Sequence, residues 1–179
     1  MPTDLTRSLL VVLIPGAIGS APWLFWLLLI TQGYPERYST IANVVGFGVA
    51  VILGLFFETL GTWIELGWDK EKDEKFQIKE NWYIYLSRCS SPEPVGHRYL
   101  SRLVTGLYFE LTMMVAVVPF SIGATALLFM RFPEQREVFL PLVALGAAAL
   151  VIYFWYNARV THELLCKTRL ELNQRLDRR

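Results

Sequence analysis

Three carboxylates lie inside or at the edge of long apolar runs in this 179-residue sequence, where an ionised side chain is costly. They are Glu58, Glu65 and Glu110. Glu65 follows Glu58 by seven residues, so on a helix the two carboxylates share one face about 10 Å apart. Glu110 lies at a depth similar to that of Glu58 in another apolar run. We expect such groups to face the interior of a helix bundle or water rather than lipid.

Three basic residues near the same boundary are candidate partners for these carboxylates: Arg102, Arg159 and His162. Three interpretations of the six side chains are open. They could form a structural network that holds the helices together, line a polar vestibule or ion pathway, or form a metal or catalytic site.

Motifs of enzymatic chemistry are absent from the sequence. No phosphate-binding glycine-rich loop, HExxH, GxSxG or CxxC pattern is present. Two histidines are too few for a histidine-rich metal centre, and Cys89 and Cys166 are far apart. Basic residues do not alternate with aromatic residues as they do in nucleic-acid-binding proteins. We therefore predict no catalytic residue, metal, cofactor or nucleic acid, and favour a non-enzymatic protein.

A stripe of small residues leads to Glu58. Ala42, Gly46, Ala50 and Gly54 recur at every fourth position, and the next step is Glu58. Small residues at this spacing let membrane helices approach closely, because hydrophobic burial does not drive association inside lipid. The stripe could pack against the first or third apolar segment of the same chain, or it could form a subunit interface. Either contact would keep Glu58 away from lipid.

Four segments are long and apolar enough to cross a membrane. Of the whole chain, 54% is hydrophobic and only 18% is charged. The segments are about 8–30, 41–63, 103–130 and 138–158. The first could be mistaken for a signal peptide, but its apolar run continues through "WLFWLLLI", so we expect it to be retained. The sequence predicts a single domain over 1–179, an all-α integral membrane protein built as a four-transmembrane-helix bundle.

The distribution of basic residues predicts the orientation of the bundle. All but three of the 17 Lys and Arg residues lie in the N-terminal segment, in 64–102 or in 159–179. The exceptions are Arg37, Arg131 and Arg136. Loops rich in Lys and Arg stay in the cytoplasm, so both termini should be cytoplasmic, in a bacterial inner membrane.

The two cytoplasmic regions differ in character. In 64–102, "WDKEKDEKFQIKE" mixes acids and bases, as in a solvated helical face or a mobile loop, and the aromatic "NWYIYLSRC" suggests an interfacial helix or a docking surface. The tail, 159–179, continues the fourth helix without Pro or Gly and is amphipathic. It should project as a stalk that bundles with its copies, binds a partner or lies on anionic lipid.

These features favour a self-associating membrane protein that forms a pore or channel-like homo-oligomer. The carboxylates Glu58, Glu65 and Glu110 would line or brace its cytoplasmic half. An alternative is a membrane anchor or regulatory subunit that binds a cytoplasmic protein through 64–102 and the tail. A third possibility is a small membrane enzyme that acts on lipid through Glu110 and His162.

Overall fold

The structure is a computed structural model that describes residues 7, 9–31, 38–88 and 97–177. The described part is helical throughout and contains no strand. Its elements are η1 (Leu9–Leu13, a π-helix), α2 (Ile14–Ile30), α4 (Ser39–Phe76), α5 (Ile78–Arg88), α6 (His97–Arg131), η2 (Pro133–Gln135, a 3-10 helix) and α7 (Arg136–Asp177). The predicted all-α class is thereby confirmed.

Four of these helical segments could cross a membrane by length and composition: η1 with α2, then α4, α6 and α7. They contain the four apolar stretches that the sequence predicts. However, α4 has 38 residues and α7 has 42, so they are about 57 and 63 Å long. Because the hydrocarbon layer of a bilayer is about 30 Å thick, both helices must continue outside it.

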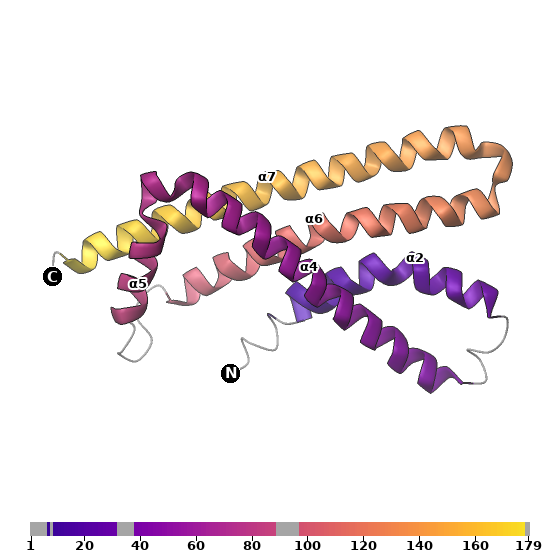
Figure 1. The fold of residues 1–179 in the computed structure, drawn as a ribbon, viewed down its shortest axis with the longest axis horizontal. Helices are drawn as coiled ribbons and strands as arrows, with labels where there is room; N and C mark the ends of the chain where they lie inside the picture. Colours follow the sequence, from indigo (N-terminus) through magenta and orange to yellow (C-terminus); the bar gives the residue numbers. More distant parts are fainter. Residues whose placement is uncertain (1–6, 8, 32–37, 89–96, 178–179) are drawn as a thin grey trace.

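The long helices form a bundle that is open at one end (Figure 1). Helices α6 and α7 pair as an antiparallel hairpin joined by η2, and α2 lies beside α6. Helix α4 crosses α2 and α6 diagonally, so its first turns diverge from α2 and its last turns reach α7. The helices are therefore close together where α4 crosses and far apart where α2 and α4 diverge.

Glycines permit the close crossing of α2 and α4. A side chain added at Gly16 would meet the main chain of Ala50, and one added at Gly54 would meet the carbonyl of Val12. Nearer the C-terminal end of α4, a Cβ added at Gly61 would lie 3.1 Å from the Cβ of Leu111 in α6. The helix backbones therefore touch at this crossing, as small residues allow inside lipid.

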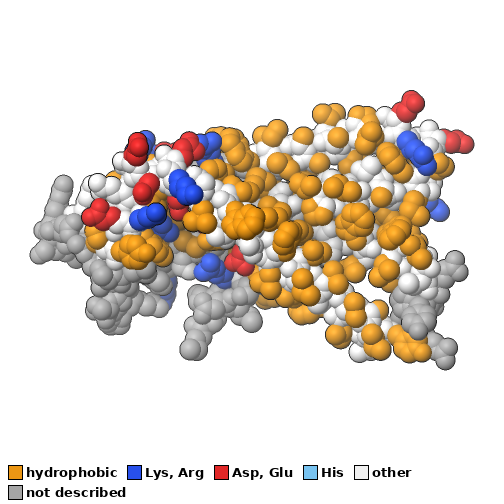
Figure 2. All heavy atoms as spheres, viewed as in Figure 1, with side chains coloured by type: hydrophobic (Ala, Val, Ile, Leu, Met, Phe, Trp, Pro, Cys, Tyr) orange, Lys and Arg blue, Asp and Glu red, His pale blue; other side chains and the backbone are white. Residues whose placement is uncertain are grey.

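The surface separates into an apolar band and two charged ends (Figure 2). Side chains in the band are mostly exposed. In the most apolar continuous stretch of 18 residues in the fourth span, no residue is buried within the chain. Such a surface would be unstable in water, but hydrocarbon solvates it well. The band therefore fits a protein embedded in a membrane.

Residues 64–76, which follow the second apolar stretch, form a helix and not the mobile loop that was the alternative prediction. Helix α4 continues to Phe76 and ends at Gln77, whose backbone is left-handed with φ 45°. The Gln77 amide donates to the carbonyl of Asp73 at 2.8 Å, which closes the helix end. Helix α5 then packs against α7.

Candidate functional site

The candidate site is a folded body at the charged end of the bundle, which we call the headpiece. It consists of the extensions of α4 and α7 beyond their apolar stretches, residues 64–76 and 159–177, together with α5. Its core contains the buried side chains of Trp68, Phe76, Ile78, Leu165 and Cys166. The predicted stalk is helical, but it packs against α4 and α5 rather than standing alone.

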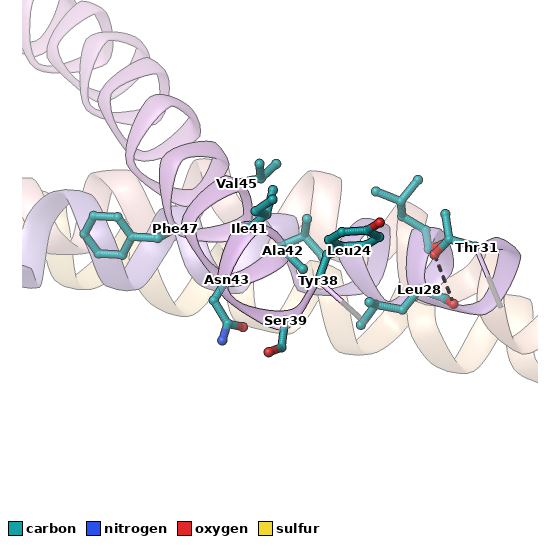
Figure 3. A pocket seen from close by; sticks show the side chains of 12 residues that line it. Leu24, Leu28, Thr31, Tyr38, Ser39, Ile41, Ala42, Asn43, Val45 and Phe47 are labelled. Carbon is teal, nitrogen blue, oxygen red and sulfur yellow. Dashed lines mark hydrogen bonds between the residues drawn. The ribbon is translucent and has the colours of Figure 1, made fainter. Parts of the chain in front are cut away.

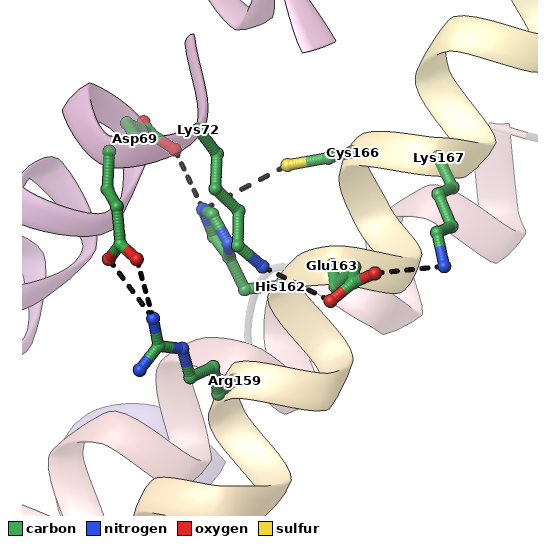
Figure 4. Close-up of polar contacts among 8 residues, drawn as sticks. Asp69, Lys72, Arg159, His162, Glu163, Cys166 and Lys167 are labelled. Atoms are coloured by element: carbon green, nitrogen blue, oxygen red, sulfur yellow. Dashed lines mark hydrogen bonds and ion pairs between the residues drawn. The ribbon is translucent and has the colours of Figure 1, made fainter. Parts of the chain in front are cut away.

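An ion pair joins α4 to α7 in the headpiece, and its Asp69 side chain is partly exposed, at 31%. His162 is only 1% exposed, and its Nε2 lies 2.8 Å from Oδ1 of Asp69 (Figure 4). The Sγ atom of Cys166 is 4.0 Å from the same nitrogen, and the ring of Trp68 stands edge-on at 5.7 Å. His162 Nδ1 is enclosed without a hydrogen-bond partner in the described part of the chain.

These neighbours determine the charge of His162, which lies past the apolar stretch of α7. Burial lowers the pKa of its imidazole, but the hydrogen bonds to Asp69 and to Cys166 outweigh burial and raise the pKa to about 9. At neutral pH the imidazole is therefore a cation, and Nε2 donates to the carboxylate. Removing Asp69 would leave the buried imidazole without its counter-charge, which is destabilising.

Three further ion pairs, each with at least one partly exposed partner, lie near the Asp69–His162 pair. Arg159 donates through Nη2 to both carboxylate oxygens of Glu71, at 2.8 and 3.1 Å. Lys72 and Lys167 contact the two oxygens of Glu163, at 3.4 and 2.9 Å. Figure 4 shows Arg159 and Glu163 of α7 meeting their partners on α4, while Lys167 pairs with Glu163 along α7. Because these pairs are partly exposed to water, each contributes only about 0–1 kcal/mol to stability.

Amide hydrogen bonds hold α5 in place. Asn81 Nδ2 donates to the carbonyl of Phe76 at 2.7 Å. Asn173 Nδ2 in α7 donates to the main-chain and side-chain oxygens of Asn81, at 2.9 and 3.0 Å. Nearby, the guanidinium of Arg169 lies 4.2 Å from the centre of the Trp82 ring. Both asparagines are buried, so these bonds give α5 a single position on α7.

The structure brings three of the six predicted polar residues together in or beside the headpiece: Glu65, Arg159 and His162. Glu65 lies next to Tyr108 of α6, within electrostatic reach of His162. Arg159 pairs with Glu71 instead of any of the three predicted carboxylates.

The other three predicted polar residues lie apart from this cluster. Glu110 lies next to Thr161 of α7, and its enclosed Oε2 has no hydrogen-bond partner within the described residues. Glu58 is half-buried, and its carboxylate has no ion pair in the described part. Arg102 is exposed and likewise has no described ion pair. The six residues therefore do not form one network.

Several headpiece residues were missed by sequence reasoning. The string "WDKEKDEK" looks like a uniformly solvated surface, yet it supplies Asp69, Glu71 and Lys72 to the contacts with α7. A helical signal was present, because Trp68 and Phe76 are two turns apart on the same face. Continuing the second helix past 63 would have placed Asp69 beside that face.

The small-residue stripe divides into two halves. Ala50 and Gly54 contact the first helical segment of the same chain. Ala42 and Gly46 lie where α2 and α4 diverge, and they line an apolar groove. Gly46 has room for a side chain, since its nearest neighbour would be Leu24 at 3.8 Å. Only the inner half of the stripe therefore packs helix against helix within the chain.

Catalytic chemistry would need access that these groups lack. His162 and Cys166 are both buried, so a substrate could not reach the imidazole or the thiol without opening the headpiece. Among residues 7, 9–31, 38–88 and 97–177, no group of three or more His, Cys, Asp or Glu side chains is arranged to hold a metal ion.

Comparison with known proteins finds no match for this chain. No protein-family model matches the chain, and neither does any curated protein or solved structure. The geometry of the headpiece and of the apolar band is therefore the basis on which a function can be inferred.

Proposed function

We propose that this chain is a membrane anchor that holds a preformed headpiece at the cytoplasmic surface, where the headpiece binds a protein partner. One observation carries this proposal. Helices α4 and α7 leave the apolar band as continuous helices and are joined outside it by the Asp69–His162 pair, and the Asn81–Asn173 hydrogen bonds join α5 to α7. A chain that only crossed the membrane would not need this folded body.

The type of interaction that joins these helices supports a positioning role. An ion pair with a buried partner, or a buried amide pair, adds little net stability compared with apolar packing, but it permits only one relative placement of the helices. The headpiece therefore presents its outer face in a constant geometry relative to the bundle. The excess of Lys and Arg at this end supports a cytoplasmic location for that face.

Exposed aromatic and apolar side chains lie on the headpiece and on the first turn of α6, which packs beside it. Tyr83 of α5 is 70% exposed, Tyr99 of α6 is 50% exposed, and Leu164 of α7 is 42% exposed. Tyrosine is enriched at protein interfaces because it combines a large apolar ring with a hydrogen-bonding hydroxyl. These three side chains are the positions at which a partner would first be sought.

Site-specific photocrosslinking in cells tests the proposal. A photoreactive residue at Tyr83, Tyr99 or Leu164 should yield a covalent product with one recurring cytoplasmic protein. The matched control is Ile52, which is 68% exposed but lies in the apolar band of α4. The absence of protein products at all three positions would refute the proposal. Truncation at 164 is a poorer test, because Leu165 and Asn173 belong to the headpiece core.

A pore-forming homo-oligomer is the second candidate, and Glu58 favours it. This carboxylate is half-buried in α4 without a described ion pair, and the apolar stretch of α7 is free to meet other subunits. Ion flux through liposomes should then change in Glu58→Gln and Glu110→Gln but not in Glu171→Gln, whose side chain is exposed on the headpiece. Flux no greater than that of protein-free liposomes would rule out the pore, and equal flux in the wild type and all three variants would rule out a role for the carboxylates in it.

A further inference from the structure

A groove opens between α2 and α4 at the end of the bundle opposite the headpiece. Its volume is about 930 Å3 (Figure 3). Helix α2 and its C-cap residue Thr31 form one wall, and the first turns of α4 form the other wall. The lining includes Leu24, Thr31, Ser39, Asn43, Gly46 and Phe47.

We propose that this groove binds a membrane phospholipid, with an acyl chain between α2 and α4 and the glycerol ester region at Ser39 and Asn43. The proposal goes beyond the headpiece function and does not depend on it. It rests on the shape, the length and the polarity of the groove.

The shape favours a thin, flexible occupant. The backbones of α2 and α4 touch at Gly16 and Ala50, and from there the two helices diverge toward Thr31 and Ser39 (Figure 1). The groove is therefore a wedge that closes at its inner end. A second helix, with a diameter of about 10–12 Å, is too wide and too stiff to fill the narrow part. An acyl chain can follow the taper.

The length of the groove matches one leaflet of a bilayer. Its lining on α4 runs from Ser39 to Phe47, which is about 12 Å of helix. Half of the hydrocarbon thickness is about 15 Å. A chain that enters at Ser39 would therefore reach nearly to the middle of the bilayer before the helices close.

The polar groups sit only at the wide end. Ser39 and Asn43 are exposed, are four residues apart, and project from the same side of α4 (Figure 3). Neither side chain has a hydrogen-bond partner among the described residues, whereas the Thr31 hydroxyl donates to the carbonyl of Leu27 at 2.8 Å. The Ser39 hydroxyl and the Asn43 amide are donors, and the ester and phosphate oxygens of a phospholipid are acceptors. Binding would satisfy polar groups that are costly to leave bare at this depth.

Filling the groove tests the proposal. Gly46→Leu would place a side chain in the groove, where its Cβ meets only Leu24 at an ordinary distance. Gly48→Leu is the matched control, because a Cβ at Gly48 meets nothing within 4 Å. Each protein is purified with repeated detergent washing, and native mass spectrometry then counts the phospholipids that remain. Asn43→Leu, which changes only an exposed side chain, provides a second variant that should fold normally.

The expected result is that the wild type and Gly48→Leu retain a phospholipid, and that Gly46→Leu and Asn43→Leu lose most of it. Equal retention of phospholipid by all four proteins would overturn the proposal, because lipid that adheres nonspecifically to the apolar surface does not depend on the groove. A dimer that dissociates only in Gly46→Leu, with no retained lipid in the wild type, would also overturn it and would assign the groove to a second copy of the chain.

Discussion

Single glycines control how closely α4 approaches the first helical segment, which is η1 followed by α2. Gly54 faces the carbonyl of Val12, so the smallest possible side chain at this position would collide with backbone rather than with a movable side chain. Gly48, six residues earlier on the same helix, faces open space. The two glycines therefore have opposite roles, although each is surrounded by a similar apolar sequence.

We predict that Gly54→Ala destabilises the bundle and that Gly48→Ala does not. Overpacking at Gly54 should cost about 1–3 kcal/mol, because the two helices must separate. At Gly48 the higher helix propensity of alanine should leave stability unchanged or raise it by up to about 1 kcal/mol. Thermal unfolding in detergent measures both effects. An unchanged melting temperature for Gly54→Ala would contradict the described crossing.

The Asp69–His162 pair predicts how headpiece stability depends on pH. The pKa of His162 is about 9 in the folded chain and 6.5 in the unfolded chain. A raised folded pKa contributes stability that is complete below pH 6.5 and is lost as the pH rises toward about 9. The melting temperature should therefore fall between these values. In Asp69→Asn the fall should be much smaller, and an identical fall would show that the pair does not act in this way.

At the scale of elements, Gln77 determines where α4 ends and α5 begins. Its left-handed backbone (φ 45°) is unfavourable for any residue with a Cβ, by roughly 1–2 kcal/mol. The conformation nevertheless lets the Gln77 amide reach Asp73 and turns the chain so that α5 packs against α7. Glycine is the residue that this position prefers.

We predict that Gln77→Gly raises the stability of the headpiece by about 1 kcal/mol and that Gln77→Val lowers it. The β-branched valine is the harsher test, because its side chain disfavours a left-handed backbone most strongly. Chemical denaturation followed by the fluorescence of the six tryptophans, which include Trp68 and Trp82 in the headpiece, measures both effects. If both variants were equally stable, the turn at Gln77 would not have the described conformation.

At the scale of the whole molecule, the apolar band and the two charged ends suit a chain that crosses a membrane four times. We predict that the headpiece faces the cytoplasm and that η2 faces the opposite side, because most Lys and Arg residues accompany the headpiece. Alkaline phosphatase should be active when fused at Glu134 and inactive when fused after Arg179. A fluorescent protein that folds only in the cytoplasm should show the reverse pattern, and activity of the phosphatase at both sites would disprove the orientation.

The amino-acid sequence alone was sufficient to predict the class of the protein and its four spans. Both depend on local properties, because about 20 consecutive apolar residues must form a helix in lipid whatever lies beside them. Gly54 was likewise identifiable as a packing residue, since its spacing from Ala50 is visible in the sequence. The cytoplasmic orientation depends on residue counts and stays a prediction.

Only the tertiary structure decided which polar groups meet. Asp69 and His162 are 93 residues apart, so no local pattern indicates that they pair, and their contact requires α4 to continue past its apolar stretch and to cross toward α7. The same crossing opens the groove at Gly46, while it closes the helix contact at Gly54. Helix length is a local property, whereas the angle at which helices cross depends on the fit of all their surfaces at once.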